Sequence, residues 1–119
     1  MALKYNVWQS SNVAILDLNG RLSLGEALAF GPGSGVVLSD TIRELTKKGQ
    51  KKILLNLAEV TYVDSSGLAV LIEAMQNVRG YGGHFGVVGL QEPVRTVFEI
   101  ARLDQVFQIY PTLDGALVT

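Results

Sequence analysis

The stretch that decides the fold is Val60-Thr-Tyr-Val-Asp-Ser-Ser-Gly-Leu68, which links a strand pattern to a helix pattern. The strand before it, Lys52-Ile-Leu-Leu-Asn-Leu57, is apolar on both faces, which is typical of a strand in the middle of a sheet. A loop is predicted from Ala58 to Asp64, and a helix from Ser65 to Arg79. One face of that helix is apolar and consists of Leu68, Leu71, Ile72, Met75 and Val78.

The polar residues at the start of this helix have two interpretations. Asp64 is placed to be the N-cap, because its carboxylate can accept a hydrogen bond from a free N–H group of the first turn. Asp-Ser-Ser-Gly is therefore a good helix start and needs no further role. A serine on the first turn is also exposed, and a phosphate there would meet unpaired N–H groups and the positive end of the helix dipole. Ser65 could thus be phosphorylated without unfolding its own helix.

The rest of the chain alternates between strand and helix patterns. Two strands of a hairpin, residues 3–9 and 13–18, come first, and a loop rich in glycine and proline follows at residues 25–35. Leu38, Ile42 and Leu45 have helical spacing, with Ser39 or Asp40 able to cap that helix. Further on, the predicted elements are a strand at 84–89, a helix from Pro93, a strand at 106–110 and a helical turn within 112–118. This order predicts one α/β domain with right-handed crossovers and a parallel or mixed sheet.

Composition limits the classes of function. The 119 residues are 48% hydrophobic and 18% charged, as expected for one globular domain. A net charge of −1 gives no electrostatic drive toward nucleic acid or an anionic membrane. The apolar runs are too short to cross a bilayer, and the amino terminus does not resemble a signal peptide. Together with the absence of cysteine, this predicts a cytoplasmic protein that neither inserts into membranes nor binds nucleic acid.

No constellation of catalytic residues is visible, so we expect no enzyme activity. His84 is the one histidine, and the Gly-x-Ser-x-Gly elbow of serine hydrolases does not occur. Gly31-Pro-Gly-Ser-Gly35 lacks the lysine that a phosphate-binding P-loop needs. No pattern of metal ligands is present either. The sequence therefore predicts neither a cofactor nor a metal.

The sequence resembles the STAS domains, named for sulfate transporters and anti-sigma factor antagonists. The core of the resemblance is Asn56-Leu-Ala-Glu-Val-Thr-Tyr-Val-Asp-Ser-Ser-Gly-Leu-Ala-Val-Leu71. It extends to Asn19-Gly-Arg-Leu22, the Gly82-Gly83 turn and the Pro93-x-x-x-x-Phe98 helix followed by Leu103. Within the family, the chain is most similar to bacterial anti-anti-sigma factors. The resemblance implies a single STAS domain over residues 1–119, with a mixed sheet of four to five strands and about four helices.

The resemblance also implies a function in transcription. Ser65 corresponds to the serine that is phosphorylated, and Asp64, Ser65, Ser66 and Gly67 correspond to the partner-binding surface. The expected partners are an anti-sigma factor with serine kinase activity and a separate serine phosphatase. Unphosphorylated protein would bind the anti-sigma factor and release the sigma factor.

The chain departs from compact members of the family in two places. Residues 25–35 form an insertion, which could alter which partner docks, and Ser23 stands where some relatives have an acidic residue. Two other classes of function stay open. One is a STAS accessory subunit of a membrane transport complex, and the other is a small enzyme or small-molecule-binding domain.

Overall fold

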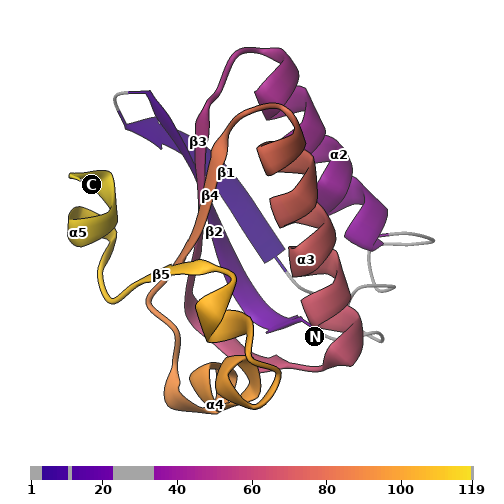
Figure 1. Ribbon diagram of the computed structural model, residues 1–119, viewed down its shortest axis with the longest axis vertical. Coiled ribbons are helices and arrows are strands. Elements are labelled where there is room, and N and C mark those ends of the chain that lie inside the picture. Colours follow the sequence, from indigo (N-terminus) through magenta and orange to yellow (C-terminus); the bar gives the residue numbers. More distant parts are fainter. Residues whose placement is uncertain (1–3, 11, 23–33, 119) are drawn as a thin grey trace.

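The computed structural model describes residues 4–10, 12–22 and 34–118 (Figure 1). In this part of the chain, five strands form one sheet in the order β1-β2-β3-β4-β5. The strands are β1 (Lys4–Ser10), β2 (Val13–Leu22), β3 (Lys52–Val63), β4 (His84–Val88) and β5 (Gln108–Tyr110). β1 is antiparallel to β2, and every other neighbouring pair is parallel. The predicted mixed sheet is therefore confirmed.

Helices connect the parallel strands, as the alternating pattern predicted. The described helices are α2 (Ser34–Lys47), α3 (Ser65–Gly80), α4 (Glu92–Ile100) and α5 (Leu113–Leu117), with a short 3₁₀ helix at Leu103–Gln105. Figure 1 shows α2 and α3 side by side on one face of the sheet, and α5 on the opposite face. α4 lies beyond the end of the sheet at which α3 begins. That end carries the carboxyl ends of the parallel strands.

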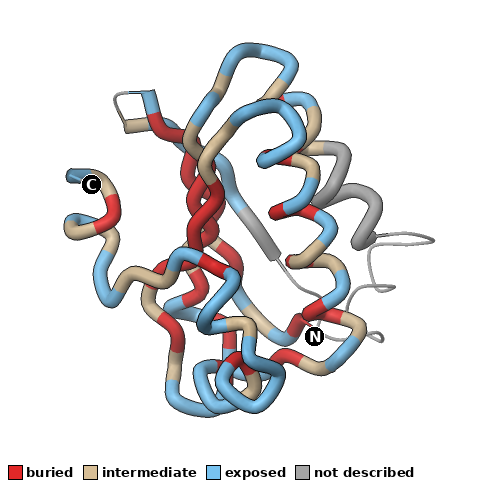
Figure 2. The backbone as a smooth tube through the Cα atoms, viewed as in Figure 1, coloured by how far each residue is buried: buried red, intermediate tan, exposed pale blue. Residues whose placement is uncertain are grey.

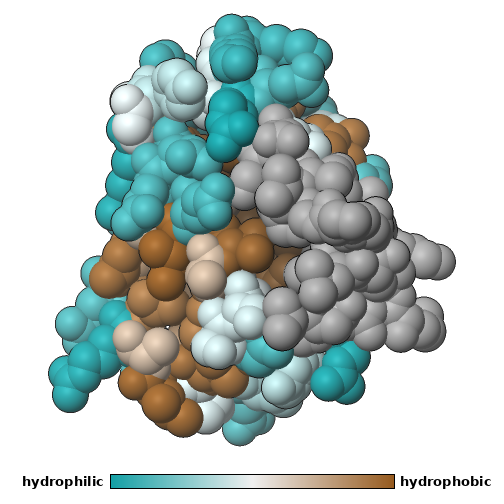
Figure 3. Space-filling model, turned by 90° about the vertical axis from the view of Figure 1, so that its right-hand side faces the viewer, coloured by the Kyte–Doolittle hydropathy of each residue, from teal (hydrophilic) through white to brown (hydrophobic). Residues whose placement is uncertain are grey.

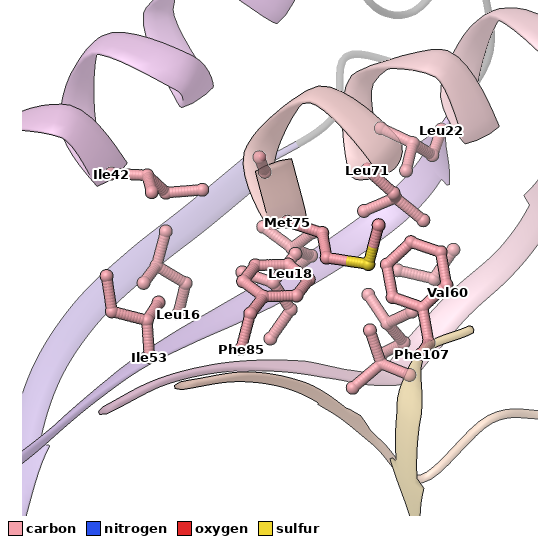
Figure 4. Packing of buried hydrophobic residues seen from close by; sticks show 14 of the residues in the cluster. Leu16, Leu18, Leu22, Ile42, Ile53, Val60, Leu71, Met75, Phe85 and Phe107 are labelled. Atoms are coloured by element: carbon pink, nitrogen blue, oxygen red, sulfur yellow. The ribbon is translucent and has the colours of Figure 1, made fainter. Parts of the chain in front are cut away.

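The larger core fills the space between the sheet and helices α2 and α3 (Figure 4). Leu16 and Ile53 from the sheet pack there with Ile42 of α2, while Leu71 of α3 is fully buried. A smaller cluster lies under α5 on the other face; it consists of Val13, Ile15, Leu54, Val88 and Ala116. β3 contributes to both clusters, which confirms its predicted central position. Figure 2 shows the same concentration of buried residues along the middle strands and the inner side of α3.

β3 is longer than predicted, because residues 58–63 continue the strand instead of forming a loop. Two irregularities in the pairing with β2 each insert one extra residue into β3. Val60 and Val63 both point into the core as a result, while Thr61 and Tyr62 between them are exposed. A bulge breaks the strict alternation by which a strand is identified in a sequence. The sequence pattern at the end of β3 therefore predicted a loop.

Other boundaries differ by smaller amounts. α2 begins at Ser34, ahead of the predicted cap at Ser39 or Asp40, so residues 34–35 of the predicted insertion are helical. The remainder, residues 25–33, lies outside the described part of the chain, as does Ser23. A stretch rich in glycine and proline is typical of a loop, so composition did not mark this boundary. Ile72 was predicted to face the sheet with Leu71, but it is half-buried at the margin of the core.

Candidate functional site

Asp64 caps helix α3, as the sequence predicted. Its backbone is extended, with φ −110° and ψ −173°. One carboxylate oxygen, Oδ1, accepts a 3.0 Å hydrogen bond from the N–H of Gly67. The Asp64 carbonyl accepts the first helical hydrogen bond, 2.9 Å long, from the N–H of Leu68. The cap thereby fixes where the helix begins and places Ser65 on its first turn.

Gly67 is buried where the first turn of α3 crosses the end of β2. A Cβ atom on Gly67 would overlap the carbonyl oxygen of Leu22 and lie 2.9 Å from its carbonyl carbon. The same carbonyl accepts a 3.2 Å hydrogen bond from the N–H of Asp64. Only glycine lets the helix come this close to the strand. The sequence placed Gly67 in a partner-binding surface, and the structure adds a packing reason for glycine at this position.

Ser65 is exposed, and Ser66 beside it is half-buried. Ser65, Ala69 and Ile72 have the spacing of one helix face, and Ala69 is exposed while Ile72 is half-buried. Figure 3 shows hydrophobic atoms gathered over α3 on this side of the molecule, below a hydrophilic upper part. Ser65 therefore lies at the start of a helix face that continues with Ala69 and Ile72.

The start of α3 combines the N–H groups of the first helical turn with the carboxylate of Asp64 at the cap. The first turn contains no acidic residue, and its earliest N–H groups have no acceptor within the helix. These groups and the helix dipole favour a negative charge at the helix start by about 0.3–1 kcal/mol. A phosphate on Ser65 would lie in this field, next to the carboxylate of Asp64.

Sequence reasoning did not single out Arg21 and Tyr62, which lie on the neighbouring strand ends. The guanidinium carbon of Arg21 is 4.4 Å from the centre of the Tyr62 ring. The two residues are directly opposite each other in the pairing of β2 with β3. Both are exposed. The motif Asn19-Gly-Arg-Leu22 was visible in the sequence, but the bulge that brings Tyr62 opposite Arg21 was not.

His84 lies at the other end of the sheet, where it pairs with Lys52 at the start of β3. Its Nε2 atom is 2.9 Å from the hydroxyl oxygen of Tyr110. Burial lowers the pKa of His84 from its ordinary value, and the positive charges of Lys52 and Arg79 lower it further. Since Ser65 follows the opposite end of β3, the structure does not bring His84 and Ser65 together.

Within the described residues, no three histidine, cysteine or acidic side chains lie close enough together to hold a metal ion. Helices of the described part of the chain are too short or too polar to span a membrane. Two surface cavities flank α4, with volumes of about 340 and 280 Å³, and both are lined in part by Arg95 and Glu99.

Comparison of the sequence with known proteins identifies related proteins. The model of the STAS domain matches residues 4–116. The chain is 27% identical over 116 residues to the anti-sigma-F factor antagonist RsfB of Mycobacterium tuberculosis, covering 98% of this chain and 88% of RsfB. It is 39% identical over 74 residues to the TM1081 homolog of Thermotoga neapolitana. That second match spans 62% of this chain and 66% of the relative, just under two thirds of its length.

Solved structures give the same result for the fold. An anti-sigma factor antagonist from Mycobacterium paratuberculosis superposes with a TM-score of 0.79 at 24% identity, covering 98% of this chain and 92% of that chain. SpoIIAA of Bacillus in its phosphorylated form superposes with a TM-score of 0.69 at 16% identity, covering 96% of each chain. At these identities the likeness is one of fold alone.

Proposed function

Because the chain belongs to the STAS domain family, we propose that it is an anti-sigma factor antagonist switched by phosphorylation of Ser65. It acts as a binding module in the regulation of transcription rather than as an enzyme. Unphosphorylated protein binds an anti-sigma factor that has serine kinase activity, and the bound sigma factor is released. A separate serine phosphatase restores the unphosphorylated state.

The observation that carries this proposal is that Ser65 is exposed on the first turn of α3, on the helix face that continues with Ala69 and Ile72. Relatives named as anti-sigma factor antagonists, RsfB among them, support the partner class. The fold also matches SpoIIAA, which has been solved both with and without phosphorylation. A fold of this kind therefore accepts the modification.

The switch follows from where the added charge lies. Phosphorylation adds about −1.5 to −2 charges to Ser65. In the free protein these charges face water and the positive end of α3, so the fold changes little. In a complex they face a packed interface, where an unpaired buried charge costs several kcal/mol. Each 1.4 kcal/mol weakens binding about tenfold, so the modified protein is released.

The test is incubation with ATP and purified serine-kinase anti-sigma factors of the source organism. Intact mass and peptide mapping then locate the phosphate. We expect one phosphate on Ser65, labelling of Ser66→Ala, and no labelling of Ser65→Ala. Ser65→Ala should bind the partner constitutively, and Ser65→Asp should bind at least about tenfold more weakly at an unchanged melting temperature. A phosphate on Ser66, or wild-type binding by Ser65→Asp, would contradict the proposal.

A further inference from the structure

A second exposed feature lies at the same end of the sheet as Ser65. The Arg21 guanidinium stacks on the Tyr62 ring at 4.4 Å, and 41% of the Tyr62 surface is accessible to solvent. Among the described residues, the Tyr62 ring is the contact that the structure gives for this guanidinium. The ring is thus accessible to a partner, and aromatic side chains contribute large areas to interfaces.

An irregularity in the pairing of β2 with β3 brings Arg21 and Tyr62 together. One extra residue is inserted into β3 between the partners of Gly20 and Arg21, so that Tyr62 comes opposite Arg21 on the surface. Gly20 has φ +121°, which allows β2 to bend at this point. Bulges re-aim side chains and are frequent beside functional sites. Regular pairing would have placed Thr61 opposite Arg21, without an aromatic ring.

The pair is fixed in position relative to the turn that carries Ser65. Leu22 follows Arg21 directly, and its carbonyl accepts the hydrogen bond from Asp64 and packs against Gly67. Leu22 itself points into the core beneath α3. Consecutive residues of a strand point to opposite faces, so Arg21 lies on the face away from α3. Ser65 and Arg21 therefore lie on two sides of the contact between Leu22 and the first turn of α3.

We propose that Arg21, supported by Tyr62, is a specificity-determining contact that receives a carboxylate of the anti-sigma partner. This inference rests on the proposed function, because it assumes a partner that docks at Ser65. The proposal requires that the partner cover the end of the sheet and contact both Ser65 and Arg21. The guanidinium stacked on a ring keeps its N–H groups free at its edge, and two of them match the geometry of a carboxylate. The aromatic ring holds it in that orientation before binding.

A carboxylate of the partner fits better than a phosphate on this chain's own Ser65. Arg21 lies on the other face of the sheet from α3, so its guanidinium is directed away from the first turn of that helix. The interface model and the internal-phosphate model make different predictions. In the first, Arg21 strengthens binding of the unphosphorylated protein. In the second, it affects only the phosphorylated form.

The experiment measures the affinity of unphosphorylated variants for each purified serine-kinase anti-sigma factor by titration calorimetry at two salt concentrations. We expect Arg21→Glu to bind at least about tenfold more weakly than wild type, and Arg21→Lys and Tyr62→Leu to lie between them. Lys48→Glu is the matched control, because it makes the same change of charge on an exposed residue in the turn that precedes β3, away from Arg21. It should bind as wild type does. Melting temperatures verify that each variant is folded.

The decisive arm is a charge exchange. A partner variant in which the contacting Asp or Glu is replaced by Lys should bind the Arg21→Glu protein more tightly than it binds the wild-type protein. Wild-type affinity of a folded Arg21→Glu overturns the inference, and so does a change confined to the phosphorylated protein. If Ser65→Asp still releases the partner in those cases, the proposed function survives. If Arg21→Glu weakens binding while Ser65→Asp does not, the switch is wrong and the interface is supported.

Discussion

At the scale of single residues, the contact between Gly67 and Leu22 is the tightest constraint on the site. We expect Gly67→Ala to destabilise the protein by about 1–3 kcal/mol or more, because the new methyl group meets a backbone carbonyl that cannot move aside. Urea unfolding followed by circular dichroism measures this change.

Gly80, at the other end of α3, is the matched control. A Cβ atom there meets nothing within 4 Å, and Gly80 is not among the glycines with positive φ. Gly80→Ala should therefore be neutral or stabilise the protein by up to about 1 kcal/mol. Equal effects of the two substitutions would show that the helix does not pack on Leu22 as described.

The cap is a second constraint at this scale. Asp64→Ala removes the acceptor for the N–H of Gly67 and should cost about 0.5–2 kcal/mol. Asp64→Asn keeps an acceptor oxygen and should cost less. Thermal unfolding of the two variants separates the hydrogen bond from the charge. A loss as large in Asp64→Asn as in Asp64→Ala would mean that the negative charge, rather than the hydrogen bond, stabilises the helix start.

At the scale of elements, α3 has one buried face and one that stays open. Leu71 is fully buried, so Leu71→Ala should cost about 2–5 kcal/mol. Ile72 is half-buried beside the exposed Ala69, and Ile72→Ala should cost clearly less. Chemical denaturation of both variants gives the comparison. A larger loss at Ile72 than at Leu71 would mean that the helix is rotated about its axis.

The sequence was sufficient for elements that have a regular period. The central strand was predicted from the apolar run Ile53, Leu54 and Leu55, and the start of α3 from Asp64. Both features depend only on residues that are neighbours in the sequence. The end of β3 was missed because its bulges break the alternation at Thr61 and Tyr62. Ile72 was misjudged because a helix pattern gives the direction of the apolar face but not its width. The Arg21–Tyr62 contact joins residues far apart in the chain, and only the strand register reveals it.

At the scale of the whole molecule, we expect stability to depend on pH through His84, at the end of the sheet opposite Ser65. His84 binds protons less readily in the folded protein than in the unfolded chain, since burial, Lys52 and Arg79 lower its pKa. The unfolded state therefore takes up more protons as the pH falls below the ordinary histidine pKa of about 6.5. Stability associated with His84 is complete above that pH and is lost as the pH decreases through the lowered pKa.

This prediction is tested by melting curves of wild type and His84→Gln at about pH 7.5 and about pH 5.5. Glutamine cannot take up the proton, so the loss of melting temperature between the two pH values should be smaller in the variant. Carboxylates titrate in both proteins and cancel in the comparison. The same loss in both proteins would show that protonation of His84 does not affect stability.

The order of the strands in the sheet is the same as their order in the chain. Each strand after the first adds to the edge of the sheet made by those before it, and none has to be inserted between two strands already paired. Sheet formation can therefore advance in one direction while the ribosome is still making the chain, with the β1–β2 hairpin as its starting point. The turn that carries Ser65 is synthesised directly after the central strand. The surface proposed for the partner therefore needs only strands and a helix that precede β4 in the chain, and β4 can add to the edge of the sheet afterwards.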